Sequence, residues 1–285
     1  MKLFNFSKNK PEDNEEDRLE NYAEMLNCKL LFIDEPKIDG DKILDELKKH
    51  FDNVENVSKD KSFIFQFSDF QIELADATIP AQCLIAVPDD GKFEVEIPDT
   101  AFQQNWHWPE AEEMVRNCNY EILVTDFMSR TLPYKERFNL YMEFLAAVTK
   151  ITQPNAIYSF HAEKIINPVE FIDAWESGHN SILDILCNVR LYNISDSENN
   201  ELIMDSVGLH SFGLPDFQIK FSEFEFEAND IANLLWNYVY YVFEYGDVIE
   251  NGNTLEGTES GSKWVCEREM AIILPERVVL NVQPD

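Results

Sequence analysis

Residues 120–160 read YEILVTDFMSRTLPYKERFNLYMEFLAAVTKITQPNAIYSF and contain the clearest structural pattern in the chain. The stretch begins with Tyr120–Thr125 and ends with Ala156–Phe160, and both segments are rich in the apolar, β-branched and aromatic residues of strands. Between them, Pro133 suits the first turn of a helix, and Pro154 cannot continue one. The stretch therefore predicts a strand-helix-strand unit.

Two segments of the chain have apolar residues at helical spacing. One follows Pro133, and the other ends near Gly246, a residue suited to the helix C-terminus. We expect the apolar faces of these two helices to form the core. The residues that the spacing assigns to the core are Phe138, Met142, Leu145, Ile231, Leu235 and Val239.

Further strands are predicted on both sides of this unit. Cys28–Ile33 is a short apolar run, and Ser62–Phe67 and Phe70–Leu74 predict two strands joined by a Ser-Asp turn. Asn188–Ile194 and Glu201–Asp205 predict a hairpin. The fold class is therefore α+β, a mixed or antiparallel sheet with packed helices.

The domain organisation follows from composition. Residues 1–27 form a polar lead-in, in which Leu19–Leu26 predicts a short helix. No long linker rich in Gly, Ser or Pro interrupts the rest of the sequence. We therefore expect a single α+β domain over residues 28–285.

The chain is strongly acidic. It has 285 residues with 23 Lys+Arg and 54 Asp+Glu, and its formal net charge is −31. Such a charge repels nucleic acid and anionic lipid surfaces, so we expect no nucleic-acid or membrane partner. Ser62–Val115 has 11 acidic residues and one base, and Leu191–Ser262 has 14 and one. These stretches serve solubility, a basic partner or mimicry of a nucleic acid.

The five cysteines fit a reducing compartment. No two of them form a CxxC pair, and the odd number does not fit a disulfide framework. We expect all five to be reduced. The sequence begins without an apolar export segment, and no apolar run approaches the ~18–20 residues of a membrane span. These features predict a cytoplasmic protein.

Motifs for specific chemistry are scarce. The chain has no glycine-rich nucleotide loop and no metal-ligand spacing, so we expect no cofactor and no metal. Asp126 and Arg130 follow a predicted strand, where they can pair with each other. If the protein is an enzyme, its site is assembled around residues 118–161, and the candidate catalytic residues are Cys118, Asp126, Arg130 and His161.

Trp106 and Trp108 flank His107. In an extended chain, alternate side chains point the same way, so both indoles would face one side. Aromatic pairs bind ligands well, but they dominate cores equally. We expect both rings to pack against the sheet.

Several separated blocks share their order and spacing with a known family. The blocks are Pro80–Gln82, Trp106–Glu113, Tyr120–Asp126, Tyr134–Arg137, Gly208–Leu209, Gly213–Gln218, Glu244–Glu250 and Pro275–Leu280. Over roughly residues 28–282 the chain resembles the bacterial "domain of unknown function 4261" family. The resemblance implies a cytoplasmic bacterial protein with one α+β domain. It brings no activity, cofactor or catalytic residue.

Two functions from different classes remain. The sequence favours a non-catalytic acidic binding protein, of the immunity or scaffold type, with a basic protein partner. Its expected contacts are the acidic residues of predicted loops, namely Asp196, Glu198, Asp247, Glu250, Glu256 and Glu259. The alternative is a small-molecule enzyme with its site around residues 118–161. The sequence does not decide whether the protein is an enzyme, and it favours a protein without catalytic activity.

Overall fold

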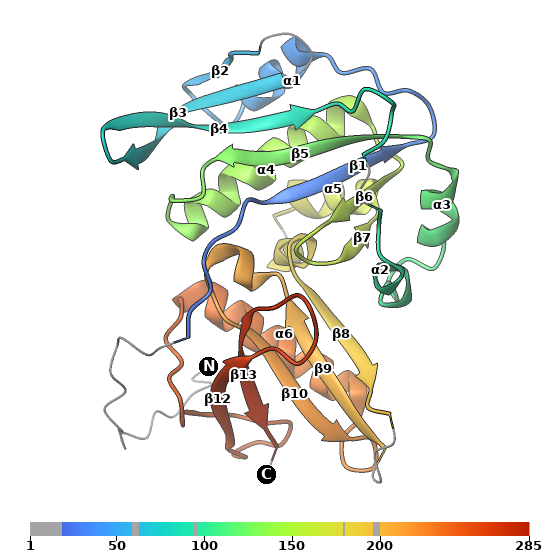
Figure 1. The fold of residues 1–285 in the computed structure, drawn as a ribbon, viewed down its shortest axis with the longest axis vertical. Helices are drawn as coiled ribbons and strands as arrows, with labels where there is room; N and C mark the ends of the chain where they lie inside the picture. The colour runs from blue at the N-terminus through green and yellow to red at the C-terminus, as the bar shows by residue number, and fades with distance from the viewer. Residues whose placement is uncertain (1–18, 59–62, 94–95, 179, 196–199, 285) are drawn as a thin grey trace. The chain divides into compact units, whose positions relative to one another are not determined.

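The computed structural model describes residues 19–58, 63–93, 96–178, 180–195 and 200–284 (Figure 1). The chain divides into two compact units. The N-terminal unit consists of residues 24–186, and the C-terminal unit consists of residues 1–23 together with 187–285. Each unit has its own sheet. The sequence, by contrast, predicted a single domain from residue 28. The boundary at Leu186–Cys187 has no linker-like composition, so nothing in the sequence marks it.

The N-terminal unit is built on a seven-stranded sheet in the order β2-β3-β4-β5-β1-β6-β7. Neighbouring strands in this sheet are antiparallel. The strands are β1 (Asn27–Phe32), β2 (Val54–Asn56), β3 (Phe63–Leu74), β4 (Ala77–Ala86), β5 (Tyr120–Met128), β6 (Ala156–Ser159) and β7 (Lys164–Ile166). Its helices are α1 (Gly40–Leu47), α2 (Asp99–Gln103), α3 (Ala111–Asn117), α4 (Tyr134–Thr152) and α5 (Pro168–Glu176).

The predicted strand-helix-strand unit is confirmed as β5, α4 and β6. The sequence did not predict which strand separates β5 from β6. β1 lies between them and is antiparallel to both, so β5 and β6 run in the same direction. The α+β fold class is confirmed as well.

The two faces of this sheet have different coverings. On one face, α4 packs its Phe144 ring against Phe65 and Phe67 of β3. On the other face, Leu31 and Tyr158 lie in an apolar cluster with residues of α2 and α3. Because adjacent strand residues point to opposite faces, β1 contributes to both layers. The core residues predicted on α4, Phe138, Met142 and Leu145, are all buried.

The prediction of two strands over Ser62–Leu74 was wrong, because β3 is continuous from Phe63 to Leu74. Its pairing with β4 shifts register between Phe67 and Gln71, so the Ser-Asp pair forms an irregularity within the strand rather than a turn. The main-chain N–H and side-chain amide of Asn53 both donate to the Asp69 carboxylate. A contact from a distant segment thus holds the irregular backbone in place.

The C-terminal unit has a six-stranded sheet in the order β11-β12-β13-β10-β9-β8. β10 and β13 are parallel, and the other neighbours are antiparallel. The strands are β8 (Asn188–Asn193), β9 (Glu201–Val207), β10 (Asp216–Ser222), β11 (Thr254–Leu255), β12 (Trp264–Met270) and β13 (Val278–Gln283).

One helix, α6 (Ala228–Tyr245), covers one face of this sheet, and its Tyr238 ring lies 5.3 Å from that of Phe217. The predicted core residues Ile231, Leu235 and Val239 are buried. Gly246 ends the helix at a φ of 83°, which favours glycine, as predicted. None of the helices that the structure describes is long and apolar enough to cross a membrane.

The short helix predicted at Leu19–Leu26 is absent, because residues 19–26 adopt no helical structure. Asn21 explains this conformation. Its side chain accepts a hydrogen bond from the Val278 N–H at 2.7 Å and donates to the carbonyls of Leu214 and Val278. The chain at Asn21 therefore lies against the start of β13 instead of forming a helix.

Truncation of the α4 core tests the helical stripe. Leu145→Ala should lower the free energy of unfolding by about 2–5 kcal/mol, because a fully buried leucine leaves a cavity. Asn139→Ala, at an exposed position of the same helix, should change it by less than about 0.5 kcal/mol. Urea denaturation of both variants measures the difference, and equal midpoints would contradict the assignment.

Candidate functional site

Asp126, a predicted catalytic candidate, is buried at the end of β5. Its carboxylate accepts hydrogen bonds from Ser129 Oγ at 2.7 Å and from the Leu26 N–H at 2.6 Å, and it forms an ion pair with Arg137 of α4. The expected local pair with Arg130 is not formed, and Arg130 is exposed. Burial raises the pKa of Asp126, and the Arg137 charge and the hydrogen bonds partly offset this effect. These contacts join Asp126 to the start of β1 and to α4.

Cys118 and His161 have structural partners of their own. Cys118 is buried in the apolar cluster with Leu31 and Tyr158, and burial raises its pKa to about 11. A thiol with this pKa is almost entirely protonated at neutral pH, so Cys118 is a poor nucleophile. His161 Nε2 lies 2.6 Å from the Met25 carbonyl. Cys118 thus packs in an apolar cluster and Asp126 and His161 make polar contacts within the unit, whereas Arg130 is exposed.

The tryptophan pair behaves differently from its prediction. Trp108 is buried in the apolar cluster, as expected, but Trp106 is 59% exposed and its Nε1–H donates to the Gln103 carbonyl at 3.0 Å. The chain bends at His107 instead of staying extended, so the two indoles do not share a side. The prediction was therefore right for Trp108 and wrong for Trp106.

A buried cluster of charged residues in the C-terminal unit was not predicted. Asp205 of β9 forms ion pairs with Arg190 of β8, its cross-strand neighbour, and with Arg277, which precedes β13. All three residues are at most 2% exposed. A charged residue between apolar neighbours in a strand, such as Arg190 between Val189 and Leu191, is the sequence signal for a buried partner.

Asp216, at the start of β10, is the second anion of this cluster. Its carboxylate accepts hydrogen bonds from Ser206 Oγ and from the N–H groups of the turn that follows β9, and it pairs with His210 Nδ1 at 2.9 Å and Arg277 Nε at 3.2 Å. Burial alone would raise the pKa of Asp216. The His210 hydrogen bonds and the Arg277 charge outweigh burial and lower it. The cluster is a neutralised structural core.

The acidic residues predicted for binding differ in their contacts and exposure. Asp196 and Glu198 lie outside the described residues. Asp247 forms an ion pair with Arg268 of β12, and a Glu256 carboxylate oxygen accepts a hydrogen bond from the Gly261 N–H. Glu250 and Glu259 are exposed. The structure therefore leaves two of the four described residues facing solvent.

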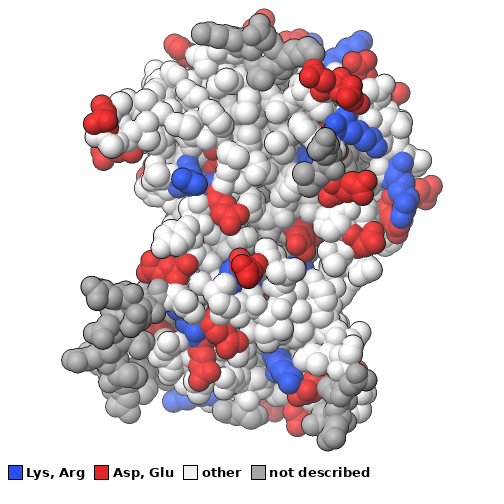
Figure 2. Space-filling model, viewed as in Figure 1, with Lys and Arg blue, Asp and Glu red and all other residues white. Residues whose placement is uncertain are grey.

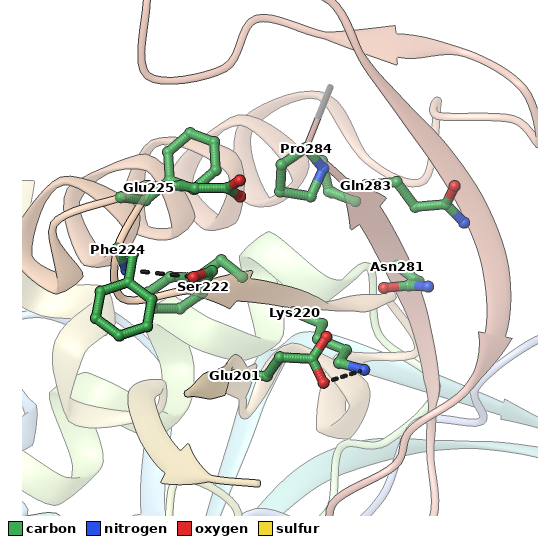
Figure 3. A pocket seen from close by; sticks show the side chains of 11 residues that line it. Glu201, Lys220, Ser222, Phe224, Glu225, Asn281, Gln283 and Pro284 are labelled. Atoms are coloured by element: carbon green, nitrogen blue, oxygen red, sulfur yellow. Dashed lines mark hydrogen bonds and ion pairs between the residues drawn. The ribbon is translucent and has the colours of Figure 1, made fainter. Parts of the chain in front are cut away.

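A pocket of about 580 Å³ opens in the C-terminal unit at the carboxyl ends of β10 and β13 (Figure 3). The two strands pair from Asp216–Gln218 to Val279–Asn281, and the pocket lies just beyond this pairing. Ligands often bind outside the carboxyl ends of parallel strands. The polar and aromatic side chains that line it include Glu201, Lys220, Ser222, Phe224, Glu225 and Asn281.

The lining of this pocket combines charge and apolar surface. Lys220 Nζ lies 2.9 Å from the Glu201 carboxylate, and Phe224 is 75% exposed beside the exposed Glu225. Figure 3 shows these side chains around a central space, with the Lys220–Glu201 pair on one side and Glu225 on the other. The pocket thus offers carboxylate and aromatic surface to a ligand, and no metal-ligand set of His or Cys.

The C-terminal unit also contains the part of the chain that comparison identifies. Residues 205–283 match the family described as Domain of unknown function (DUF4261). The resemblance predicted over roughly residues 28–282 is thus confirmed for this part. The matched segment includes Asp205, Asp216 and Arg277 of the buried cluster and most of the pocket. No curated protein and no solved structure matches the chain.

Removing one charge from the buried cluster tests its structural role. Asp216→Asn should lower the free energy of unfolding by about 3–5 kcal/mol, because Arg277 loses one of its carboxylate partners inside the protein. Glu276→Gln, at an exposed neighbouring position, serves as the control and should have little effect.

The difference in unfolding free energy between the wild type and Asp216→Asn should also depend on pH. The pKa of Asp216 is lowered in the folded state, so its stabilisation is complete above the unfolded value of about 4 and declines as the pH falls through the lower folded pKa. The stability gap between wild type and Asp216→Asn should therefore narrow below about pH 4. A gap that is small at pH 7, or that widens in acid, would contradict the assignment.

The cysteines give a further test. All five are free and buried, as predicted, and burial raises the pKa of Cys28 to about 11 and of Cys266 to about 12. We expect no rapid labelling by a thiol reagent at pH 8 in the folded protein, and labelling of all five in urea. Stoichiometry from mass spectrometry measures this, and a cysteine labelled rapidly in the folded state would contradict its burial.

Proposed function

We propose that the chain is a non-catalytic binding protein for a basic protein partner, and that the C-terminal unit carries the interface. One observation carries the proposal. Residues 187–284 contain five Lys and Arg residues, and four of them form ion pairs with acidic residues of the same unit. The positive charges of residues 187–284 are thus largely neutralised by acidic residues of the same segment.

The exposed surface of this unit is correspondingly acidic. Among its described residues, the exposed acidic side chains are Glu20, Glu223, Glu225, Glu227, Asp230, Glu244, Glu250, Glu259, Glu267 and Glu276. Figure 2 shows acidic side chains in several separate groups, with basic side chains beside some of them. A surface of this kind favours a partner with several positive charges and speeds its association.

The contacts of the catalytic candidates also support a binding role. The pKa of the Cys118 thiol is raised, and the Asp126 carboxylate is paired with Arg137. The reaction of an enzyme at residues 118–161 would first have to break these structural contacts. We therefore propose an immunity-like or scaffold protein, acting in the cytoplasm, where five free cysteines stay reduced.

Charge reversal on exposed residues tests this function. Partners captured from the native cell lysate at low salt are identified by mass spectrometry, and one is purified for kinetic measurements. With Glu250→Lys/Glu259→Lys, the association rate should fall by about tenfold or more, because both side chains are exposed in the loops on either side of β11. Asp247 is left intact, because it pairs with Arg268.

The matched control is Asp34→Lys/Glu35→Lys, an equal charge change at exposed positions of the N-terminal unit. The control should retain most of the association rate of the wild type. Raising the salt should slow association to the wild type, since screening shortens electrostatic attraction to below about 8 Å above 0.15 M. An association rate that ignores both salt and the reversal would overturn the proposal.

A further inference from the structure

We propose that the pocket at the carboxyl ends of β10 and β13 anchors a basic side chain, arginine or lysine, from an extended segment of the protein partner. The inference rests on the proposed function and assigns it a site. The pocket is built from strands β9, β10 and β13 and from the turn that follows β10. It therefore belongs wholly to the C-terminal unit.

The charges of the lining select a cation. Glu201 and Glu225 are acidic, and Lys220 is the single base among the residues that line the pocket. Because Lys220 pairs with Glu201, the carboxylate of Glu225 is left without a basic partner among the described residues. An incoming anion would be repelled by Glu225, whereas a guanidinium or ammonium group would be attracted.

Phe224 supplies the second element of cation recognition. Its side chain is 75% exposed, and it is adjacent to Glu225 in the chain. The face of an aromatic ring attracts a cation within about 6 Å of its centre. A carboxylate and an aromatic face in one pocket bind a basic side chain through its charge and through its flat or apolar part.

The remaining lining suits the main chain of a peptide. Asn281 carries an amide with no hydrogen-bond partner among the described residues, and amides can both donate to and accept from a peptide. The volume of about 580 Å³ lies in the range of pockets that hold small ligands, and it exceeds that of one side chain. The pocket therefore has room for the basic side chain and the backbone that carries it.

The acidic loop of the proposed interface adjoins this pocket. Phe226, a lining residue, packs edge-on against Trp264 with ring centroids 5.3 Å apart. The same indole lies against Gly257, where an added Cβ would come within 2.3 Å of it. Trp264 therefore lies between Phe226 of the pocket and the start of the loop 256–262.

A defined peptide tests the pocket directly. The probe is a fluorescent seven-residue peptide of alternating arginine and glycine, and its reference is the same peptide with citrulline in place of arginine. Fluorescence anisotropy with the full chain measures both affinities. Phe224→Ala and Glu225→Gln should each lower the affinity for the arginine peptide by about twofold to fivefold. This is the effect expected from the loss of one exposed cation–π or ion-pair contact. Phe224→Tyr keeps the ring and should retain the affinity.

Leu274→Ala and Glu276→Gln are the matched controls, since both residues are exposed in the same unit and neither lines the pocket. They should leave the affinity unchanged. Equal affinities for the citrulline and arginine peptides would overturn the inference. So would an affinity for the arginine peptide that is the same in both pocket variants as in the wild type. Tighter binding of free arginine amide than of the peptide would overturn the peptide segment as the occupant.

The outcomes separate the inference from the proposed function. If the pocket variants leave the peptide unaffected while reversal of Glu250 and Glu259 slows the native partner, the inference fails and the proposed function stands. A second outcome is that salt and charge reversal leave the association rate of the partner unchanged while the pocket variants lower the affinity for the peptide. The proposed function then fails and the pocket remains a cation site.

Discussion

A charge removed from water must be met by an opposite charge, and the C-terminal unit depends on this constraint. Asp205 and Asp216 are buried, and Arg190 and Arg277 are buried with them. Because Arg277 contacts both carboxylates, one side chain ties the approach to β13 to β9 and β10. The same pairing removes two of the five bases of residues 187–284 from the surface. The neutral interior and the acidic exterior are thus two consequences of one arrangement.

The pocket arises from the same sheet. β13 is held beside β10 by three residue pairs next to the Asp216 end, where Arg277 is anchored. Beyond Gln218 and Asn281 the two strands no longer pair with each other, and the pocket opens there. A short parallel pairing, fixed at one end by buried charges, therefore places an exposed Phe224 and Glu225 beside the open end. Binding chemistry here depends on surface residues, and the buried charges serve to position the strands.

Local patterns predicted the parts of this fold that depend on local physics. The stripes of α4 and α6 were predictable because their spacing matches the helical repeat, and Leu145 and Leu235 are buried accordingly. Long-range contacts were not predictable in this way. Asn21 bonds with Leu214 and Val278, and these contacts replace the expected helix at the start of the described chain. The pocket combines residues from Glu201 to Pro284, which no local window contains. Among the predicted binding residues, Asp247 is paired with Arg268 because the loop after α6 folds back on β12.

The central claim is that internal ion pairing leaves the C-terminal unit with an acidic surface that binds a basic partner. Zero-length carbodiimide cross-linking tests it most directly, because this reagent joins a carboxylate to a lysine amine only when the two are in contact. The chain is cross-linked to its purified native partner, and the joined peptides are identified by mass spectrometry. The account predicts cross-links from Glu225 of the pocket and from Glu250 and Glu259, which are exposed in the loops on either side of β11. Cross-links confined to acidic residues of the N-terminal unit would contradict it.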